Sequence, residues 1–332
     1  MKKLTLLTIA ALFTACTVNT PDEISQKRDT DIISVKDKIV GVDTLMESDY
    51  YDIQTLDSFL LMQVGAPLSN QSFLTVCDLK NYEKLGELFP MGHGAGEYAN
   101  LGGFVVDEKS KLLYITDFEK FTIYGARIDS MLNNPDYKLA EKRKLDNTQF
   151  PDRFTYINDS LCIATMIFPG EMYGFQQALA KYNMATGKFT EFDYKHPDVG
   201  RKRICATASE ENNLCVECYR NYDLITLYDL EGNVKCNICG PDWNPESTEE
   251  ISYFDKVIFA NDKIIASYSG RNYRTASSPT KLFVYDTNGK YLKTLDVGSD
   301  FANFCYDKTN NRIILLNIGK FKLAYIPAEG LL

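Results

Sequence analysis

The sequence is poor in the residues that most often mark a catalytic centre. Its 332 residues include two histidines, His93 and His196, and one tryptophan, Trp243. Neither histidine belongs to a His-Glu-x-x-His zinc motif, and no Gly-x-Ser-x-Gly nucleophile motif is present. A hydrolytic triad would have to recruit one of these two histidines, both of which lie in predicted loops. The sequence therefore carries no convergent catalytic motif and no motif that implies a cofactor.

Positive charge is also in short supply. Lysine and arginine number 36 against 45 acidic residues, which gives a formal net charge of −9 at pH 7. An acidic body of this kind repels nucleic acid and anionic lipid surfaces. We therefore expect neither of them as a ligand of the folded part of the chain.

Helical periodicity is the third feature that the chain lacks. Tyrosine (21) and phenylalanine (19) are abundant, and valine, isoleucine and leucine occur in short runs. Aromatic and β-branched residues in short runs favour strands over helices. The composition predicts an all-β protein.

The N-terminus has the layout of an export signal. Lys2 and Lys3 precede an apolar run that ends at Cys16. At about 12 residues this run is too short to span a bilayer, which needs roughly 20. The segment resembles bacterial lipoprotein signals, in which a small residue precedes a cysteine that becomes acylated, although Phe13 replaces the usual leucine. A cleaved signal with a coincidental cysteine is the alternative.

The resemblance implies a location and a modification. Residues 1–15 would be removed as a signal peptide, and Cys16 would carry the lipid, including palmitate-type acyl chains. Thr17 follows the cysteine in place of the aspartate that directs retention in the inner membrane, so the resemblance favours an outer-membrane lipoprotein of the cell envelope. Residues 16–30 are polar, contain Pro21 and show no apolar period. We expect them to form a flexible tether.

A four-strand pattern recurs along the rest of the chain. Three hairpins, each with a tyrosine before the turn and a glycine in it, repeat within residues 179–192, 225–238 and 282–295. A repeat of about 40–50 residues with four strands is typical of a β-propeller, because radial stacking covers both faces of each sheet.

The repeats predict one domain, residues 31–332, with six blades of four antiparallel strands. The predicted blades lie near residues 52–90, 102–146, 153–194, 203–240, 253–298 and 302–326. The last blade lacks a fourth strand, and residues 31–42 form an unpaired strand at the other end of the chain. We expect this N-terminal strand to close the ring. A pair of β-sandwiches is the alternative fold.

A glycine-rich segment carries a family resemblance. Gly92, Gly94, Gly96, Glu97 and Tyr98 precede a predicted strand, a turn and a strand that ends in aspartate. This order resembles the blade junction of NHL-type repeats, and residues 45–326 resemble TolB-like six-bladed propeller lipoproteins. The resemblance implies a fold and an export route, but no reaction.

Four cysteines have the spacing of a zinc ribbon. They are Cys215, Cys218, Cys236 and Cys239, in the pattern C-x2-C, a spacer and C-x2-C. In the blade pattern, however, they belong to the second and fourth strands of one sheet, and residues three apart on a strand point to opposite faces. We therefore expect no metal site here. A labile disulfide within one pair stays open as an alternative.

Propeller ligands usually meet the loops at one mouth of the axial channel. The residues of this chain that we expect in or near such loops are His93, Glu97, Tyr98, Arg153, Arg203, Trp243, Tyr253, Arg271 and Tyr273. The sequence favours a non-enzymatic, lipid-anchored propeller that binds an envelope protein, a glycan or a peptide. An exported lyase or hydrolase is the alternative, and His93, Glu97 and an arginine gathered at the mouth would favour it. A structural subunit of a membrane assembly is a third alternative.

The lipid-anchor hypothesis makes a direct prediction. The substitution Cys16→Ala should release the protein from membranes, because it removes the only acylation site that the signal offers. Fractionation of cells into membrane and soluble material measures this. Equal membrane association of the wild type and Cys16→Ala would contradict the hypothesis.

Overall fold

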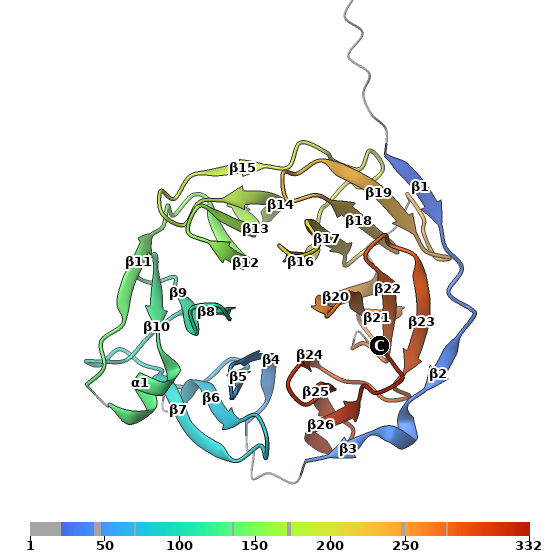
Figure 1. The fold of residues 1–332 in the computed structure, drawn as a ribbon. Helices are drawn as coiled ribbons and strands as arrows, with labels where there is room; N and C mark the ends of the chain where they lie inside the picture. The colour runs from blue at the N-terminus through green and yellow to red at the C-terminus, as the bar shows by residue number, and fades with distance from the viewer. Residues whose placement is uncertain are drawn as a thin grey trace, which may run out of the picture.

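Six β-sheets stand side by side in a closed ring in the computed structural model of the chain (Figure 1). The structure describes residues 21–42, 48–69, 71–134, 136–170, 174–246, 250–276 and 278–332. Cys16 and the predicted signal peptide lie outside these ranges. The predicted all-β, six-bladed propeller with four antiparallel strands per blade is confirmed, and the pair of β-sandwiches is wrong.

The strands of each blade follow one another from the centre to the rim. The first blade contains β4 (Tyr50–Leu56), β5 (Phe59–Val64), β6 (Ser72–Asp78) and β7 (Lys84–Pro90). The second contains β8 (Leu101–Asp107), β9 (Leu112–Asp117), β10 (Thr122–Ala126) and β11 (Ala140–Lys144), with α1 (Ile128–Asn133) before its last strand. The third contains β12 (Phe150–Asn158), β13 (Leu161–Pro169), β14 (Phe175–Tyr182) and β15 (Phe189–Glu191).

The remaining three blades repeat this order. The fourth contains β16 (Ile204–Ser209), β17 (Leu214–Tyr219), β18 (Leu224–Tyr228) and β19 (Val234–Cys239). The fifth contains β20 (Ile251–Ala260), β21 (Lys263–Asn272), β22 (Lys281–Asp286) and β23 (Tyr291–Asp296). The sixth contains β24 (Asn303–Asp307), β25 (Arg312–Ile318) and β26 (Phe321–Pro327) from the C-terminal end of the chain.

Each pair of neighbouring blades encloses its own apolar core. Leu60 and Ile314 belong to the buried cluster between the first and sixth blades, and Val284 and Leu315 to the cluster between the fifth and sixth. All four side chains are fully buried. The core is therefore a ring of separate blade interfaces, and the space along the axis is left to other side chains.

The N-terminal segment closes the ring, as predicted. Strand β3 (Val40–Gly41), which follows the 3-10 helix η1 (Lys36–Lys38), pairs antiparallel with β26 and completes the sixth blade. A Cβ atom on Gly41 would collide with the ring of Phe321. Only glycine lets the closing strand approach this ring so closely.

The expectation of a flexible tether over residues 16–30 is wrong for the part that the structure describes. Strand β1 (Asp22–Ser25) pairs parallel with β19, and β2 (Ile32–Ser34) pairs parallel with β23. The segment therefore forms a fifth, outermost strand on the fourth and fifth blades (Figure 1). An outer blade edge offers unpaired backbone N–H and C=O groups. These groups pair with the backbone of the segment, so the pairing does not require an apolar side-chain pattern.

Arg28 fixes this N-terminal segment between the fourth and fifth blades. Its side chain is buried and forms an ion pair with the buried carboxylate of Asp223. The guanidinium also lies within 4.8–6.0 Å of the ring centres of four aromatic residues, which are Phe254, Tyr268, Phe283 and Tyr285. A buried charge is tolerated only with such a partner. The segment is thus part of the domain.

In the residues that the structure describes, α1 is the one α-helix, and it has 6 residues. None of the described helices has the length and apolar character needed to cross a membrane.

The buried ion pair predicts a large stability effect. Arg28→Ala leaves the Asp223 carboxylate buried without a cation and should lower the free energy of unfolding by about 3–5 kcal/mol. The loss of unfolding free energy should be smaller at acid pH, because a protonated Asp223 is neutral and its burial does not require a cation. Urea unfolding measures both effects. The exposed neighbour Lys27 is the matched control, and equal effects of Lys27→Ala and Arg28→Ala would contradict the assignment.

Candidate functional site: the axial cavity

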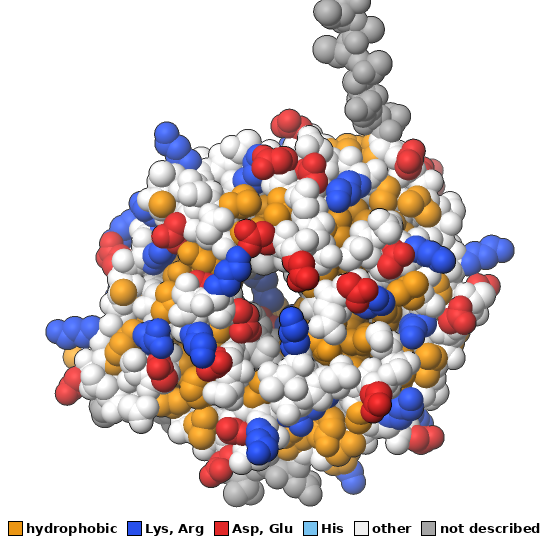
Figure 2. Space-filling view, viewed as in Figure 1, with side chains coloured by type: hydrophobic (Ala, Val, Ile, Leu, Met, Phe, Trp, Pro, Cys, Tyr) orange, Lys and Arg blue, Asp and Glu red, His pale blue; other side chains and the backbone are white. Residues whose placement is uncertain are grey.

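A large cavity runs along the axis of the ring. Its volume is about 1770 Å³, and the innermost strands of all six blades line it. Figure 2 shows the opening at the centre of one face, with side chains of both charges around it. We call this space the axial cavity.

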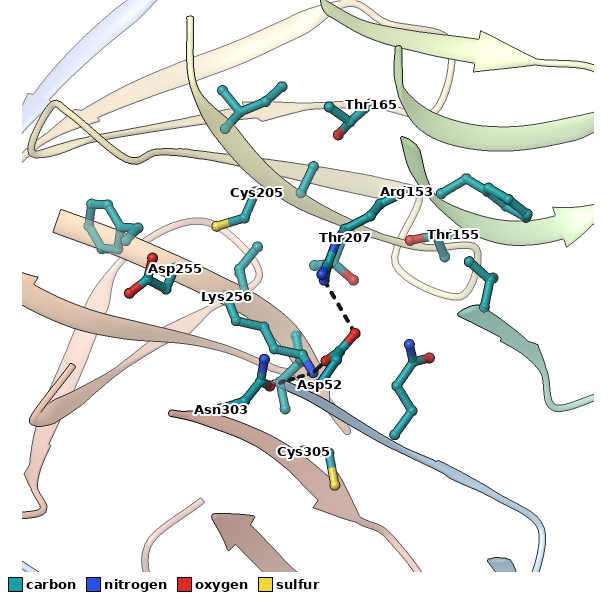
Figure 3. Close-up of a pocket in the computed structure, with 18 of the residues that line it drawn as sticks. Asp52, Arg153, Thr155, Thr165, Cys205, Thr207, Asp255, Lys256, Asn303 and Cys305 are labelled. Carbon is teal, nitrogen blue, oxygen red and sulfur yellow. Dashed lines mark hydrogen bonds and ion pairs between the residues drawn. The ribbon is translucent and has the colours of Figure 1, made fainter. Parts of the chain in front are cut away.

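A charged cluster occupies the wall of the axial cavity. The carboxylate of Asp52 is 2.7 Å from Lys256 Nζ through Oδ1 and 3.3 Å from Arg153 Nη1 through Oδ2. Lys256 also donates to Asn303 Oδ1 at 2.8 Å. Figure 3 shows these four side chains pointing toward one another across the cavity. We call them the Asp52 cluster.

The cluster draws its members from four blades. Asp52, Arg153 and Asn303 lie in the first half of the innermost strands β4, β12 and β24. Lys256 lies in the middle of β20, where the pairing with β21 is irregular between Phe254 and Val257. A bulge of this kind re-aims a side chain. Here it accompanies a lysine that reaches the cavity from a mainly apolar strand, next to Asp255.

The electrostatics of the cluster keep Asp52 charged. Burial works against the charged form, but Lys256 and Arg153 outweigh burial, and the pKa of Asp52 is lowered below its ordinary value. The backbone N–H of Ile53 also donates to Oδ1 at 2.8 Å. One carboxylate thus neutralises only one of the two cations that it holds, and the cluster keeps a net positive charge.

Two further arginines line the same end of the cavity. Arg203 precedes β16, and Arg220 follows β17, so antiparallel pairing brings them to one end, where the Arg220 N–H donates to the Arg203 carbonyl. The Arg203 guanidinium lies 3.7 Å from the ring centre of Phe175. Arg220 forms an ion pair with Asp255. We call this end, where the innermost strands begin, the arginine mouth.

The two ends of the axial cavity differ in charge. The cations at the arginine mouth are Arg153, Arg203, Arg220, Lys256 and Arg274, and the carboxylates are Asp52, Asp152, Asp255 and Glu250. At the other end, the residues that follow strands β8 and β16 line the cavity. They are Glu108, Lys109, Glu210 and Glu211. The chain as a whole is acidic, so the excess of cations at the arginine mouth is opposite in sign to the net charge of the protein.

Three of the sequence-predicted binding residues lie on the axial cavity. They are Arg153, Arg203 and Tyr273, and 51% of Tyr273 is exposed to solvent. The aromatic side chain of Tyr51, 55% exposed, lies beside them, with the Arg153 guanidinium 5.6 Å from its ring centre.

Another three lie in a separate small pocket. His93, Glu97 and Tyr98 line a space of about 240 Å³ together with Lys120. The Glu97 carboxylate accepts the Gly94 N–H at 2.7 Å, and Lys120 Nζ is 5.1 Å from the Tyr98 ring centre. Glu97 therefore fills its own glycine loop. The described lining of the axial cavity contains no histidine, so the grouping of His93 and Glu97 with an arginine at the mouth is not formed.

The last three predicted residues contact neighbouring side chains away from the axial cavity. Trp243 packs edge-on against His196 and tilted against Tyr222, with ring centres 5.0 and 5.7 Å apart. Tyr253 is buried and packs against Tyr268. Arg271 forms an ion pair with Asp300 at 2.8 Å. None of Trp243, Tyr253 and Arg271 is among the described residues that line the axial cavity.

The four cysteines of the zinc-ribbon spacing are buried in one blade. Cys215 and Cys218 lie on β17, Cys236 and Cys239 lie on β19, and β18 separates the two strands. Burial raises the pKa of the Cys239 thiol to about 11 and that of Cys215 well above its ordinary value. Across the described ranges, no group of three or more His, Cys, Asp or Glu side chains is placed to hold a metal ion.

Sequence reasoning missed most of the Asp52 cluster. The available signal was the presence of two adjacent charged residues, Asp255 and Lys256, inside a mainly apolar strand. Charged side chains inside such a strand are unfavourable unless they are paired. Asp52 and Asn303 gave a weaker signal, because polar residues at the start of a strand are common. Arg153 alone was identified.

Comparisons with solved structures support the fold. The chain is similar to a protein of Bacteroides fragilis NCTC 9343 described as exported, with a TM-score of 0.55, 13% identity and 88% of each chain covered. A member of the DUF4221 family from Bacteroides vulgatus ATCC 8482 has a TM-score of 0.56 and 10% identity, and U3-55K has 0.55 and 10%. Each of these two alignments covers 88% of this chain and 98% of the other.

These similarities show the fold alone, because all three identities are low. No model of a known protein family matches the sequence, and no curated protein matches it. The chain is a six-bladed β-propeller with an axial cavity that carries a charged cluster.

The lowered pKa of Asp52 predicts a pH-dependent stability effect. Asp52→Asn should cost about 2 kcal/mol of unfolding free energy at pH 7, because a charged hydrogen-bonding group is lost. A carboxyl with a lowered folded-state pKa stabilises above its unfolded value of about 3.9 and loses this contribution as the pH falls through the folded value. The difference between wild type and variant should therefore shrink below about pH 4.

Urea unfolding at pH 7 and pH 3 checks this expectation. Asp129→Asn, at an exposed position of helix α1, is the control and should change stability by no more than about 0.5 kcal/mol. A loss for Asp52→Asn that stays constant from pH 7 to pH 3 would contradict the assigned ionisation.

Proposed function

We propose that this protein is an exported, lipid-anchored propeller of the TolB-like and NHL-type kind, which binds a ligand of the cell envelope in its axial cavity. The observation that carries the proposal is the Asp52 cluster. A buried carboxylate is costly unless it is paired, and Asp52 with its partly exposed partner Lys256 lines a cavity open to solvent instead of a blade core. The signal-like N-terminus and the exported structural neighbour support the location.

The N-terminal segment would determine how the domain is held at a membrane. Strand β1 begins at Asp22, six residues after Cys16. Even a fully extended chain of this length spans only about 20 Å, at roughly 3.3–3.6 Å per residue. A lipid on Cys16 would therefore hold the rim of the fourth blade close to the membrane. The opening in Figure 2 lies on a face of the disc and not on its rim, so it would stay accessible.

The described residues favour binding over catalysis. An exported lyase or hydrolase was the alternative, with His93 and Glu97 beside an arginine at the mouth. The structure places His93 and Glu97 in the separate small pocket instead. In the axial cavity, Lys256 is ion-paired with Asp52 and hydrogen-bonded to Asn303. Both contacts hold its ammonium group in place on the cavity wall.

Site-specific crosslinking in cells tests the proposal, because it captures a bound molecule whatever its identity. A photoreactive benzophenone side chain at Tyr273, on the axial cavity, should capture an envelope molecule and give a product of increased mass. The same side chain at Leu85 on the outer strand β7 is the matched control, because 45% of Leu85 and 51% of Tyr273 are exposed. We expect capture at position 273 and none at 85.

Two outcomes would overturn the proposal. Equal products from both positions would place binding on the rim or make it nonspecific. Chemical conversion of a glycan or peptide by the purified protein, abolished by Lys256→Met, would replace the binding role with the catalytic alternative.

A further inference from the structure

We propose that the ligand of the axial cavity is an acidic oligosaccharide of the uronic acid type, whose carboxylates bind at the arginine mouth. This inference rests on the proposed function, because it names the ligand class for the same cavity. Three observations support it: the free donors of two arginines, the charge difference between the two ends, and the hydroxyl and aromatic groups of the lining.

Arg153 and Arg220 have hydrogen-bond donors to spare. Each is ion-paired with one carboxylate, Asp52 or Asp255, yet 43% of the Arg153 side chain and 52% of the Arg220 side chain remain exposed. A guanidinium carries five N–H donors in a fixed fork that matches carboxylate geometry. The two aspartates therefore orient the arginines and leave donors for a second, incoming carboxylate.

The charge of the arginine mouth favours an anion. Cations outnumber carboxylates in the described lining at this end, and carboxylates outnumber cations at the other. The mouth thus attracts an anion, while the acidic end disfavours its passage through the cavity.

The rest of the lining suits a ligand rich in hydroxyl groups. Thr155, Thr165 and Thr207 line the cavity (Figure 3). The Thr155 hydroxyl also accepts the Ala208 N–H at 3.2 Å, and Thr165 is buried. Tyr51 and Tyr273 are exposed aromatic side chains at the arginine mouth, and an aromatic ring offers a flat apolar face to the C–H face of a sugar ring. The cavity of about 1770 Å³ exceeds the roughly 300–1000 Å³ of a site for one small molecule. It has room for several sugar units.

Calorimetric titration with defined oligomers tests the ligand class. The probes are tetramers of galacturonate, of mannuronate and of the glucuronate-containing hyaluronan repeat, with the methyl ester of each tetramer and a tetraglutamate peptide as comparisons. We expect at least one uronate tetramer to bind. The corresponding uncharged ester should bind at least tenfold more weakly, and the affinity should fall as salt increases.

Matched variants assign the binding to the arginine mouth. Arg153→Ala should weaken uronate binding at least tenfold, and Arg153→Lys should restore part of it, because lysine keeps the charge and loses the fork. Asp52 keeps Lys256 as a partner in both variants, so the fold should persist. Arg127→Ala is the control, since Arg127 is also paired with an aspartate and 46% exposed, but lies beside helix α1.

Each contrary result overturns the inference in a defined way. Binding of none of the three uronates, or equal binding of the methyl ester, would exclude acidic sugars. Tighter binding of tetraglutamate would assign the cavity to acidic peptides. If one of these results is found and crosslinking at Tyr273 still occurs, the proposed function stands and only the ligand class is wrong. If crosslinking at Tyr273 is absent as well, both the ligand class and the proposed function are wrong.

Discussion

The single carboxylate of Asp52 organises the axial cavity. It is buried, and it holds Lys256 from the fifth blade and Arg153 from the third in fixed positions, while Lys256 also binds Asn303 of the sixth. Two cations share one anion, so the cluster pairs its charges without cancelling them. Without Asp52, two positive side chains from different blades would lie near each other with no anion between them, and Arg153 would lose its ion-pair partner.

The ring that brings these blades together depends on its N-terminal segment. Strand β3 completes the sixth blade, and the preceding residues continue along the outer edges of the fifth and fourth blades to Asp22. Arg28 fixes this path in an aromatic pocket beside Asp223. Both inner and outer surfaces of the ring thus rely on a buried aspartate that pairs with an arginine distant in sequence, Asp52 with Arg153 on the inside and Asp223 with Arg28 on the outside. The same path fixes the rim position from which a lipid anchor would extend.

The sequence predicts the blades well and the axial cavity poorly, for a physical reason. Hairpin turns carry local signals, such as Gly232 and Gly289 with φ of +93° and +80°, so the six blades and the closing strand could be located. The pairing of residues 22–34 with outer blade edges uses backbone groups and leaves no side-chain pattern. The Asp52 cluster depends on four strands meeting at the axis, and on an irregular pairing in β20 that no local motif reveals. Arg153 and Arg203 were found because charged residues near predicted loops are visible in sequence, whereas Lys256 lies inside a strand.

Crystallography of the protein with a bound uronate oligomer tests the central claim most directly. The account predicts a ligand carboxylate within about 2.7–2.9 Å of guanidinium nitrogens of Arg153 or Arg220, with the Asp52 cluster unchanged beneath it. An oligomer bound on the outer rim, or one whose carboxylates point toward the acidic end beside Glu108 and Glu210, would contradict it.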